Sequence, residues 1–214
     1  MPAPAIKICG LTDASALDAA ILAHADYAGF VFFPPSPRNL SLADAAALSA
    51  RAEGRIVRVG LFVDAGDAAI GEALTAARLD VLQLHGDETP ARAAQLRAQF
   101  GLPVWKALTV AANADVTRAA AFAGAADLIL FDARTPKGSA LPGGMGLSFD
   151  WNLVANWRGP LPWGLAGGLS PDNVAEAIRL TGAPLVETSS GVERAPGVKD
   201  ASRIAAFCRA ARGQ

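Results

Sequence analysis

Short runs of aliphatic and aromatic residues alternate with alanine-rich stretches along the whole 214-residue chain, and this alternation restricts the folds open to it. The runs lie at 6–9, 27–32, 56–63, 81–84, 103–108, 127–132, 162–167 and 184–189. Their lengths and residue types are typical of strands. Strands that alternate with helices predict a parallel sheet covered by helices.

Local signals predict where the intervening helices begin. Thr12 or Asp13 caps the first helix and Ser41 caps the second. Thr89-Pro90 and Ser170-Pro171 each open a later helix, because proline suits the first helical position after a capping residue. The expected helices cover 12–24, a segment after 41, 67–78, 90–100, 113–123, 150–156, 170–180 and 199–211.

Eight strand–helix units in a chain of this length fit a closed (βα)8 TIM barrel, so we expect an α/β fold with a single domain over 1–214. The segments 29–33 and 127–131 are apolar on both faces, as buried parallel strands are. A doubly wound open sheet is the alternative. Such a sheet usually carries its glycine-rich turn after the first strand, whereas the glycine-rich turns of this chain come late.

Composition excludes several classes of protein. Hydrophobic residues make up 52% of the chain and the net charge is −1, so the chain is neither disordered nor equipped with a basic surface for nucleic acid or membrane. No apolar run approaches the ~20 residues of a membrane span. We expect free thiols at Cys9 and Cys208, a reducing compartment, no signal peptide and therefore a cytoplasmic protein.

Two late turns predict a phosphate site. Gly167-Gly168 follows the seventh strand, and Ser189-Ser190-Gly191 follows the eighth. Glycines let the backbone approach an anion closely, and the N–H groups of a helix start point toward it. Each turn alone is explained equally well by chain geometry, but the pair matches the position of phosphate sites in barrels.

Cys9 and Asp132 are the candidate proton-transfer residues, because both end strands at the catalytic rim of a barrel. A period of two places Cys9 on the same face as Lys7, whose ammonium favours the thiolate. A buried inert cysteine is the alternative. Asp132 follows the apolar stretch 128–131, where a raised pKa suits a general acid. A carboxylate that caps the next loop or pairs with Arg134 explains Asp132 equally well.

Arg38 and His85 are candidate ligand contacts. Arg38 lies in a proline-stiffened loop that would hold a ligand carboxylate at low entropic cost, unless it is a surface side chain without a partner. His85 ends the fourth strand. Lys106 would suit a Schiff base, although a structural partner for barrel carboxylates is the preferred interpretation. The two histidines lack the spacing of a metal site.

Several motifs together resemble the phosphoribosylanthranilate isomerase family. They are IKICGLT at 6–12, QLHGDE at 83–88, LILFD at 128–132, GGMGLSFDW at 143–151, LAGGLSPDNV at 165–174 and ETSSGVERAPGVKD at 187–200. The resemblance covers nearly the whole chain in the expected order. It implies a (βα)8 barrel of tryptophan biosynthesis that works by an Amadori rearrangement, without metal or organic cofactor.

The resemblance also implies roles for single residues. Asp132 would be the general acid and Cys9 the general base. Arg38 would hold the anthranilate carboxylate, and the turns at 167–168 and 189–192 would hold the phosphate. Glu187, which stands where the family usually has Asp, would reach a sugar hydroxyl. Glycines in the loop after the sixth strand suit a mobile lid, although Leu147 stands where that loop often carries Lys.

Other phosphosugar barrels remain as alternatives. Aminoimidazole ribotide isomerase would be expected to use two rim carboxylates, whereas this chain has Cys9 at the first. Indole-glycerol-phosphate synthase usually carries an extra N-terminal helical segment. A non-catalytic phosphosugar-binding barrel would not need both Cys9 and Asp132. We expect a small phosphosugar substrate, no nucleic acid or membrane partner, and a monomer or homodimer.

Overall fold

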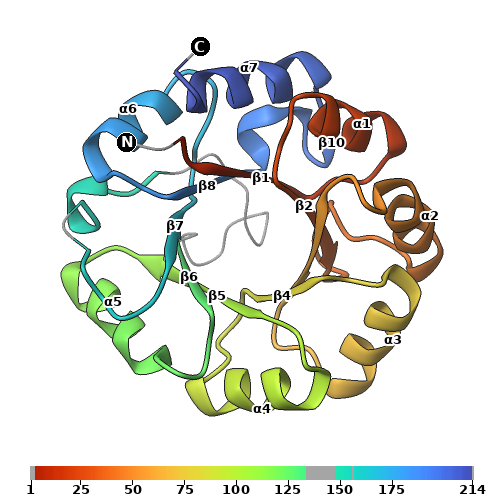
Figure 1. Cartoon of the computed structure of the whole chain (residues 1–214), viewed down its shortest axis with the longest axis horizontal. Coiled ribbons are helices and arrows are strands. Elements are labelled where there is room, and N and C mark those ends of the chain that lie inside the picture. The colour runs from red at the N-terminus through yellow and green to blue at the C-terminus, as the bar shows by residue number, and fades with distance from the viewer. Residues whose placement is uncertain (1–2, 134–147, 156, 214) are drawn as a thin grey trace.

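The computed structural model describes residues 3–133, 148–155 and 157–213. Eight parallel strands close into a barrel in the order β1 to β8, and the helices form an outer ring around it (Figure 1). The closing contact is between β1 and β8. The strands are β1 (Ala5–Cys9), β2 (Tyr27–Phe32), β3 (Val57–Phe62), β4 (Val81–Leu84), β5 (Val104–Val110), β6 (Leu128–Ala133), β7 (Trp163–Leu165) and β8 (Leu185–Thr188). The predicted (βα)8 fold is confirmed.

The helices follow the predicted positions in most units. They are α1 (Ala14–Leu22), α2 (Leu42–Ala52), α3 (Asp67–Ala77), α4 (Pro90–Phe100), α5 (Asn113–Thr117), α6 (Val174–Thr181) and α7 (Ala201–Ala211). The predicted caps act as such: the side chains of Asp13, Ser41 and Thr89 each accept a backbone N–H of the helix that follows. None of the described helices is both long and apolar enough to cross a membrane.

Three predictions of local structure were wrong. The helix expected over 113–123 is α5 followed by a 3-10 helix, η1 (Arg118–Phe122), and the helix expected over 150–156 is only the 3-10 turn η2 (Trp151–Leu153) among the described residues. The helix expected from 170 begins at 174 as α6, since Asn173 is its N-cap. An unpredicted ribbon, β9 (Glu193–Ala195) with β10 (Val198–Lys199), follows a third 3-10 helix, η3 (Ser190–Val192).

The barrel has separate cores outside and inside its wall. The larger core lies between strands and helices and includes Phe30, Phe62, Phe131 and Phe207, all at most 1% exposed. A smaller cluster, which includes Val81, Trp105 and Leu185, fills the lower barrel interior. Side chains alternate between the two faces of each strand, so every second residue points inward.

This alternation decides which polar side chains reach the barrel mouth. Cys9 packs with Val31 and Leu61 in a third small cluster at the upper end of the interior. In β6, Leu130 belongs to the interior cluster, so Asp132, two residues later, shares its face. In β5, Trp105 is interior, which places Lys106 on the outer face.

Candidate active site

Cys9 ends β1 beside a buried ion pair. The register of β1 and β8 sets Lys7 opposite Glu187, and Lys7 Nζ lies 2.6 Å from Glu187 Oε2. Lys7, Cys9 and Glu187 are 0%, 3% and 6% exposed. Gly29 of β2 makes room for them, because a Cβ there would lie 2.8 Å from Cys9 Sγ and 3.0 Å from Lys7 Nζ. The period of two predicts Lys7 beside Cys9, whereas the pairing of Lys7 with Glu187 depends on the register of β1 and β8.

The surroundings of Cys9 favour its thiol over its thiolate. Burial raises the pKa of Cys9, and the charge of Glu187 raises it further, while Lys7 opposes both. Burial by itself would lower the pKa of Lys7, but the charge and hydrogen bond of Glu187, joined by the charge of Cys9 whenever its thiolate forms, outweigh burial and raise that pKa. Lys7 therefore keeps its charge. Because Glu187 binds that charge, Lys7 favours the thiolate less than the sequence alone predicts.

Asp132 lies on the other side of the mouth in contact with His85. His85 Nε2 is 3.0 Å from Asp132 Oδ2, and Asp132 Oδ1 accepts the N–H of Ala133 at 2.8 Å. The side chains of His85 and Asp132 are 25% and 21% exposed. Asp132 therefore has polar partners, in contrast to the apolar surroundings expected from the sequence. Its alternative partner Arg134 lies outside the described residues.

Gln83 lies beneath His85 and bears on its protonation. The Gln83 amide is fully buried, and its Nε2 lies 3.3 Å from His85 Nδ1. Within the described residues, Gln83 Oε1 has no hydrogen-bond partner. Half a turn of the amide would set Oε1 against Nδ1, where it accepts a hydrogen bond from an imidazolium that donates from both nitrogens.

The imidazole of His85 is biased toward its charged form. Burial lowers the pKa of His85, but the hydrogen bond and charge of Asp132, with a smaller contribution from Glu187, raise it above its ordinary value. Glu187 thus acts on both Cys9 and His85. Thiol, imidazole and carboxyl group all face the upper barrel interior.

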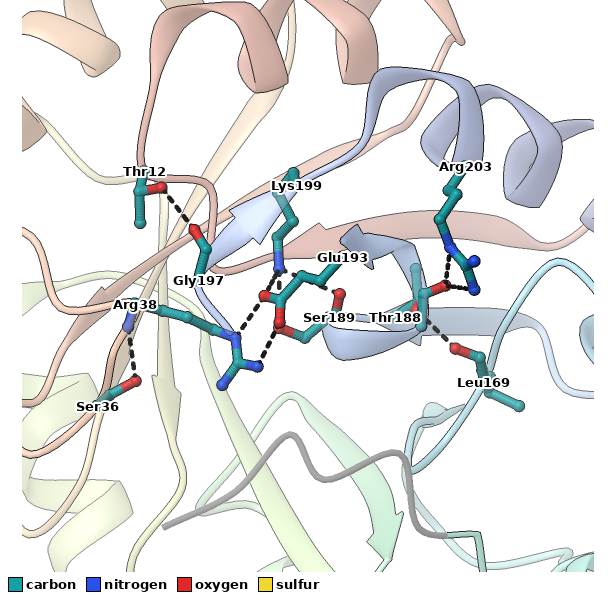
Figure 2. Close-up of polar contacts among 11 residues, drawn as sticks. Thr12, Ser36, Arg38, Leu169, Thr188, Ser189, Glu193, Gly197, Lys199 and Arg203 are labelled. Carbon is teal, nitrogen blue, oxygen red and sulfur yellow. Dashed lines mark hydrogen bonds and ion pairs between the residues drawn. The ribbon is translucent and has the colours of Figure 1, made fainter. Parts of the chain in front are cut away.

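The two late turns lie side by side, as the sequence predicted. Gly167 and Gly168 have φ of +82° and +67°, values that glycine adopts without strain. The Thr188 hydroxyl at the end of β8 donates to the carbonyl of Leu169 at 2.6 Å, which ties the two turns together (Figure 2). A Cβ on Gly191 would collide with that same carbonyl. The close approach therefore requires glycine.

Arg38 is buried and paired. It is 5% exposed, and its Nε and Nη2 each lie 2.7 Å from an oxygen of Glu193 (Figure 2). The alternative of an unpartnered surface arginine is therefore wrong. Its stem crosses Gly10, where a Cβ would collide with Arg38 Cδ. Since Gly10 follows Cys9, the stem of Arg38 passes next to the end of β1.

Two further residues considered from the sequence, Lys106 and Cys208, lie outside the barrel mouth. Lys106 lies on the outer face of β5, where its Nζ contacts Glu88 at 3.0 Å and the carbonyl of Gly86 at 2.6 Å, so it is a structural partner of a carboxylate. Cys208 is buried in α7. The loop 134–147, with Leu147 and the expected lid, lies outside the described residues.

Sequence reasoning overlooked Glu193 and Lys199. Lys199 donates to Glu193 Oε1 at 2.6 Å and to both oxygens of Ser189 at 3.1 Å. Pro196-Gly197 is a turn signal, and a hairpin around it would have set these opposite charges face to face. Among the described residues, no group of three His, Cys, Asp or Glu side chains is arranged to hold a metal ion.

Comparison with known proteins links this geometry to one family. The family model of N-(5'-phosphoribosyl)anthranilate (PRA) isomerase matches residues 6–210. The PRA isomerase of Paramagnetospirillum magneticum is 54% identical over 208 residues, 97% of each chain. Two structures of the Thermotoga maritima enzyme, one of them of monomers generated from the dimeric protein, give TM-scores of 0.88 and 0.85 at 33% identity, covering 99% of this chain and 100% of those. A PRA isomerase complex with reduced 1-(o-carboxyphenylamino)-1-deoxyribulose 5-phosphate gives 0.86 at 32% identity, with the same coverage.

Proposed function

The chain belongs to the N-(5'-phosphoribosyl)anthranilate isomerase family, and we propose that Cys9 and Asp132 transfer the protons of its reaction. The enzyme is an aldose–ketose isomerase of tryptophan biosynthesis. It converts N-(5'-phosphoribosyl)anthranilate into 1-(o-carboxyphenylamino)-1-deoxyribulose 5-phosphate by an Amadori rearrangement. This change moves protons and opens a sugar ring, so two proton-transferring groups suffice for it.

Asp132 is the proposed general acid. It gives a proton to the furanose ring oxygen, the C1–O bond breaks, and the nitrogen lone pair forms a Schiff base with C1. Its position supports this role, because Asp132 ends β6 on the inner face of the barrel and has His85 Nε2 within 3.0 Å, so an imidazole lies between the carboxyl group and solvent.

Cys9 is the proposed general base. Its thiolate takes the proton from C2 of the Schiff base, which yields an enolamine that tautomerises to the ketone. Its position at the end of β1, on the inner face and beside the Lys7 ammonium, supports this role. Because burial favours the thiol, the thiolate that takes the proton is the minor form of Cys9, and the Lys7 ammonium is the neighbouring cation that stabilises it.

The anionic ends of the substrate have separate partners. Arg38 binds the anthranilate carboxylate, and Gly167, Gly168, Ser189, Ser190 and Gly191 bind the phosphate through N–H groups and hydroxyls. Glu187 contacts a sugar hydroxyl. The adjoining turns after β7 and β8 support the phosphate site, since the Thr188–Leu169 hydrogen bond holds them together.

The proposal also covers cofactors, binding partners, oligomeric state and cellular location. The enzyme uses no metal or organic cofactor, acts on a small phosphosugar, binds neither nucleic acid nor membrane, and forms a monomer or homodimer from a single domain over 1–214. We place it in the cytoplasm, and the free thiols of Cys9 and Cys208 are consistent with a reducing compartment.

Two substitutions test the roles of the acid and the base. Cys9→Ala and Asp132→Asn should each lower kcat by about 10²–10⁴-fold, because each removes a proton-transferring group. The measurement is the decay of phosphoribosylanthranilate fluorescence with wild type and both variants. Binding of inorganic phosphate should survive in both, since neither side chain belongs to the turns. Wild-type turnover by either variant would overturn the role of that residue.

A further inference from the structure

The ribbon of β9 and β10 follows the phosphate turn and carries a buried ion pair. Its register sets Lys199 opposite Glu193, and their side chains are 0% and 5% exposed. Taking a carboxylate and an ammonium out of water is costly, and such a pair adds little stability compared with apolar packing. The contribution of this pair is therefore to be found in the groups that Glu193 and Lys199 contact.

Glu193 fixes the orientation of Arg38. Its two oxygens accept from Nε and Nη2 at 2.7 Å each, a side-on arrangement that sets the plane of the guanidinium group (Figure 2). A guanidinium has five N–H donors, and this contact uses two of them. The hydrogen bonds from Arg38 and Lys199 outweigh burial and hold the pKa of Glu193 below its usual range. The carboxylate is therefore charged.

Lys199 extends the same network to the phosphate turn. Its Nζ lies 2.6 Å from Glu193 Oε1 and 3.1 Å from both the carbonyl oxygen and the hydroxyl oxygen of Ser189. Glu193 Oε1 is thus shared between Arg38 and Lys199. One carboxylate connects the group assigned to the substrate carboxylate with the turn assigned to the phosphate.

The ribbon is also fixed to the loops after β1 and β2. The Thr12 hydroxyl donates to the carbonyl of Gly197 at 3.1 Å. Gly197 has φ of +79°, and a Cβ there would lie 2.6 Å from the carbonyl oxygen of Pro37, the residue before Arg38. These contacts hold the ribbon in one position against the loop that carries Arg38, so that the ribbon can orient the Arg38 side chain.

We propose that Glu193 and Lys199 are positioning residues that hold Arg38 and Ser189 in the geometry that binds the two anionic ends of the substrate. This inference rests on the roles of Arg38 and Ser189 under Proposed function. Because the contacts of the pair lead to the anion-binding groups, losing it weakens substrate binding more than proton transfer. A purely structural pair would instead lower stability and leave KM unchanged.

Glu193→Gln is the first test. The Gln amide keeps one oxygen but sets an NH₂ group against the donors of Arg38 or Lys199, so the side-on contact is lost. We expect KM for phosphoribosylanthranilate to rise about tenfold to hundredfold and kcat to stay within about threefold. Lys199→Met should change KM in the same direction and weaken the binding of inorganic phosphate. Glu193→Asp, which keeps the charge, should recover part of the lost affinity.

Arg194→Met is the matched control, because it removes an exposed cation from the same ribbon. Its KM should stay within about twofold of wild type. A double variant, Arg38→Met with Glu193→Gln, should raise KM by less than the product of the two single effects, because Glu193 then acts only through Lys199 and Ser189. Fully independent effects of the two substitutions would contradict the positioning role.

The outcomes separate this inference from the proposed function. A normal KM in Glu193→Gln, combined with a raised KM in Arg38→Met, would overturn only the positioning role. A normal KM in Arg38→Met would overturn the role of Arg38 itself, and this inference with it. Thermal melts establish which variants are folded, and Lys199→Met carries the test if Glu193→Gln does not fold.

Discussion

The two sides of the barrel mouth hold their charges in different ways. On the Cys9 side, Lys7 and Glu187 form an ion pair with side-chain exposures of 0% and 7%. On the Asp132 side, the His85–Asp132 contact keeps exposures of 25% and 21%. The proposed base therefore lies where water is excluded, and the proposed acid lies where solvent can replace its proton through the imidazole. The difference matches the chemistry, because a dry thiolate is a stronger base and an acid must be reprotonated each cycle.

The largest effect expected from this comparison concerns the buried pair. Glu187→Gln leaves the Lys7 ammonium buried without its counter-charge, which should lower the free energy of unfolding by about 3–5 kcal/mol. The loss of unfolding free energy is measured from the midpoints and slopes of urea-unfolding curves of wild type and variant. The double variant Lys7→Met with Glu187→Leu should regain much of that loss, because no buried charge remains. A loss below about 1 kcal/mol in Glu187→Gln would mean that the two sides do not differ in this way.

A smaller, pH-dependent effect is expected on the exposed side. The pKa of His85 is raised in the folded protein, so its contribution to stability is complete below the unfolded value and is lost as pH rises through the folded value. Below about pH 6.5, the free energy of unfolding of wild type should exceed that of His85→Gln by about 1.5 kcal/mol. This difference in stability should shrink as the pH rises.

The control for the histidine prediction is Asp132→Asn. Removing the carboxylate removes the largest cause that raises the pKa of His85, so in that background the stability difference caused by His85→Gln should no longer shrink as the pH rises. Urea titrations at several pH values between about 5.5 and 8.5 cover the window around the unfolded histidine value. A difference that grows with rising pH would contradict the assigned sign.

The smallest effect is expected at the cysteine outside the mouth. Burial raises the pKa of Cys208 to about 11, and its helix position keeps it away from the proposed chemistry. Cys208→Ala should leave kcat and KM within about twofold of wild type and cost about 1 kcal/mol of stability through lost packing. A kinetic assay beside Cys9→Ala tests this contrast. If Cys208→Ala lost as much activity as Cys9→Ala, a position outside the barrel mouth would not make a cysteine dispensable for activity.

Local patterns predicted most of the fold. Strand β2 is apolar on both faces, and the caps at Asp13, Ser41 and Thr89 are short-range signals that a sequence displays directly. The prediction of a helix over 150–156 was wrong, because the described residues there form only the 3-10 turn η2. Local sequence does not distinguish a helix from a 3-10 turn when tertiary packing overrides propensity. The ribbon at 193–199 was missed because its strands are short and partly exposed.

The candidate site was predictable where it depends on strand position, and less so where it depends on register. Cys9 and Asp132 could be placed because a period of two and a strand end suffice. The pairing of Lys7 with Glu187 joins residues 180 positions apart and follows from the way β1 meets β8. The contact between Arg38 and Glu193, 155 positions apart, likewise depends on where the ribbon packs.

The pairing of the first and last strands has a consequence for synthesis of the protein. The carboxylate opposite Lys7 belongs to β8 and is translated 180 positions after Lys7. The ribosome must therefore make all the intervening strands before this ion pair can form. The surroundings of Cys9 are complete only once β8 pairs with β1 and closes the barrel.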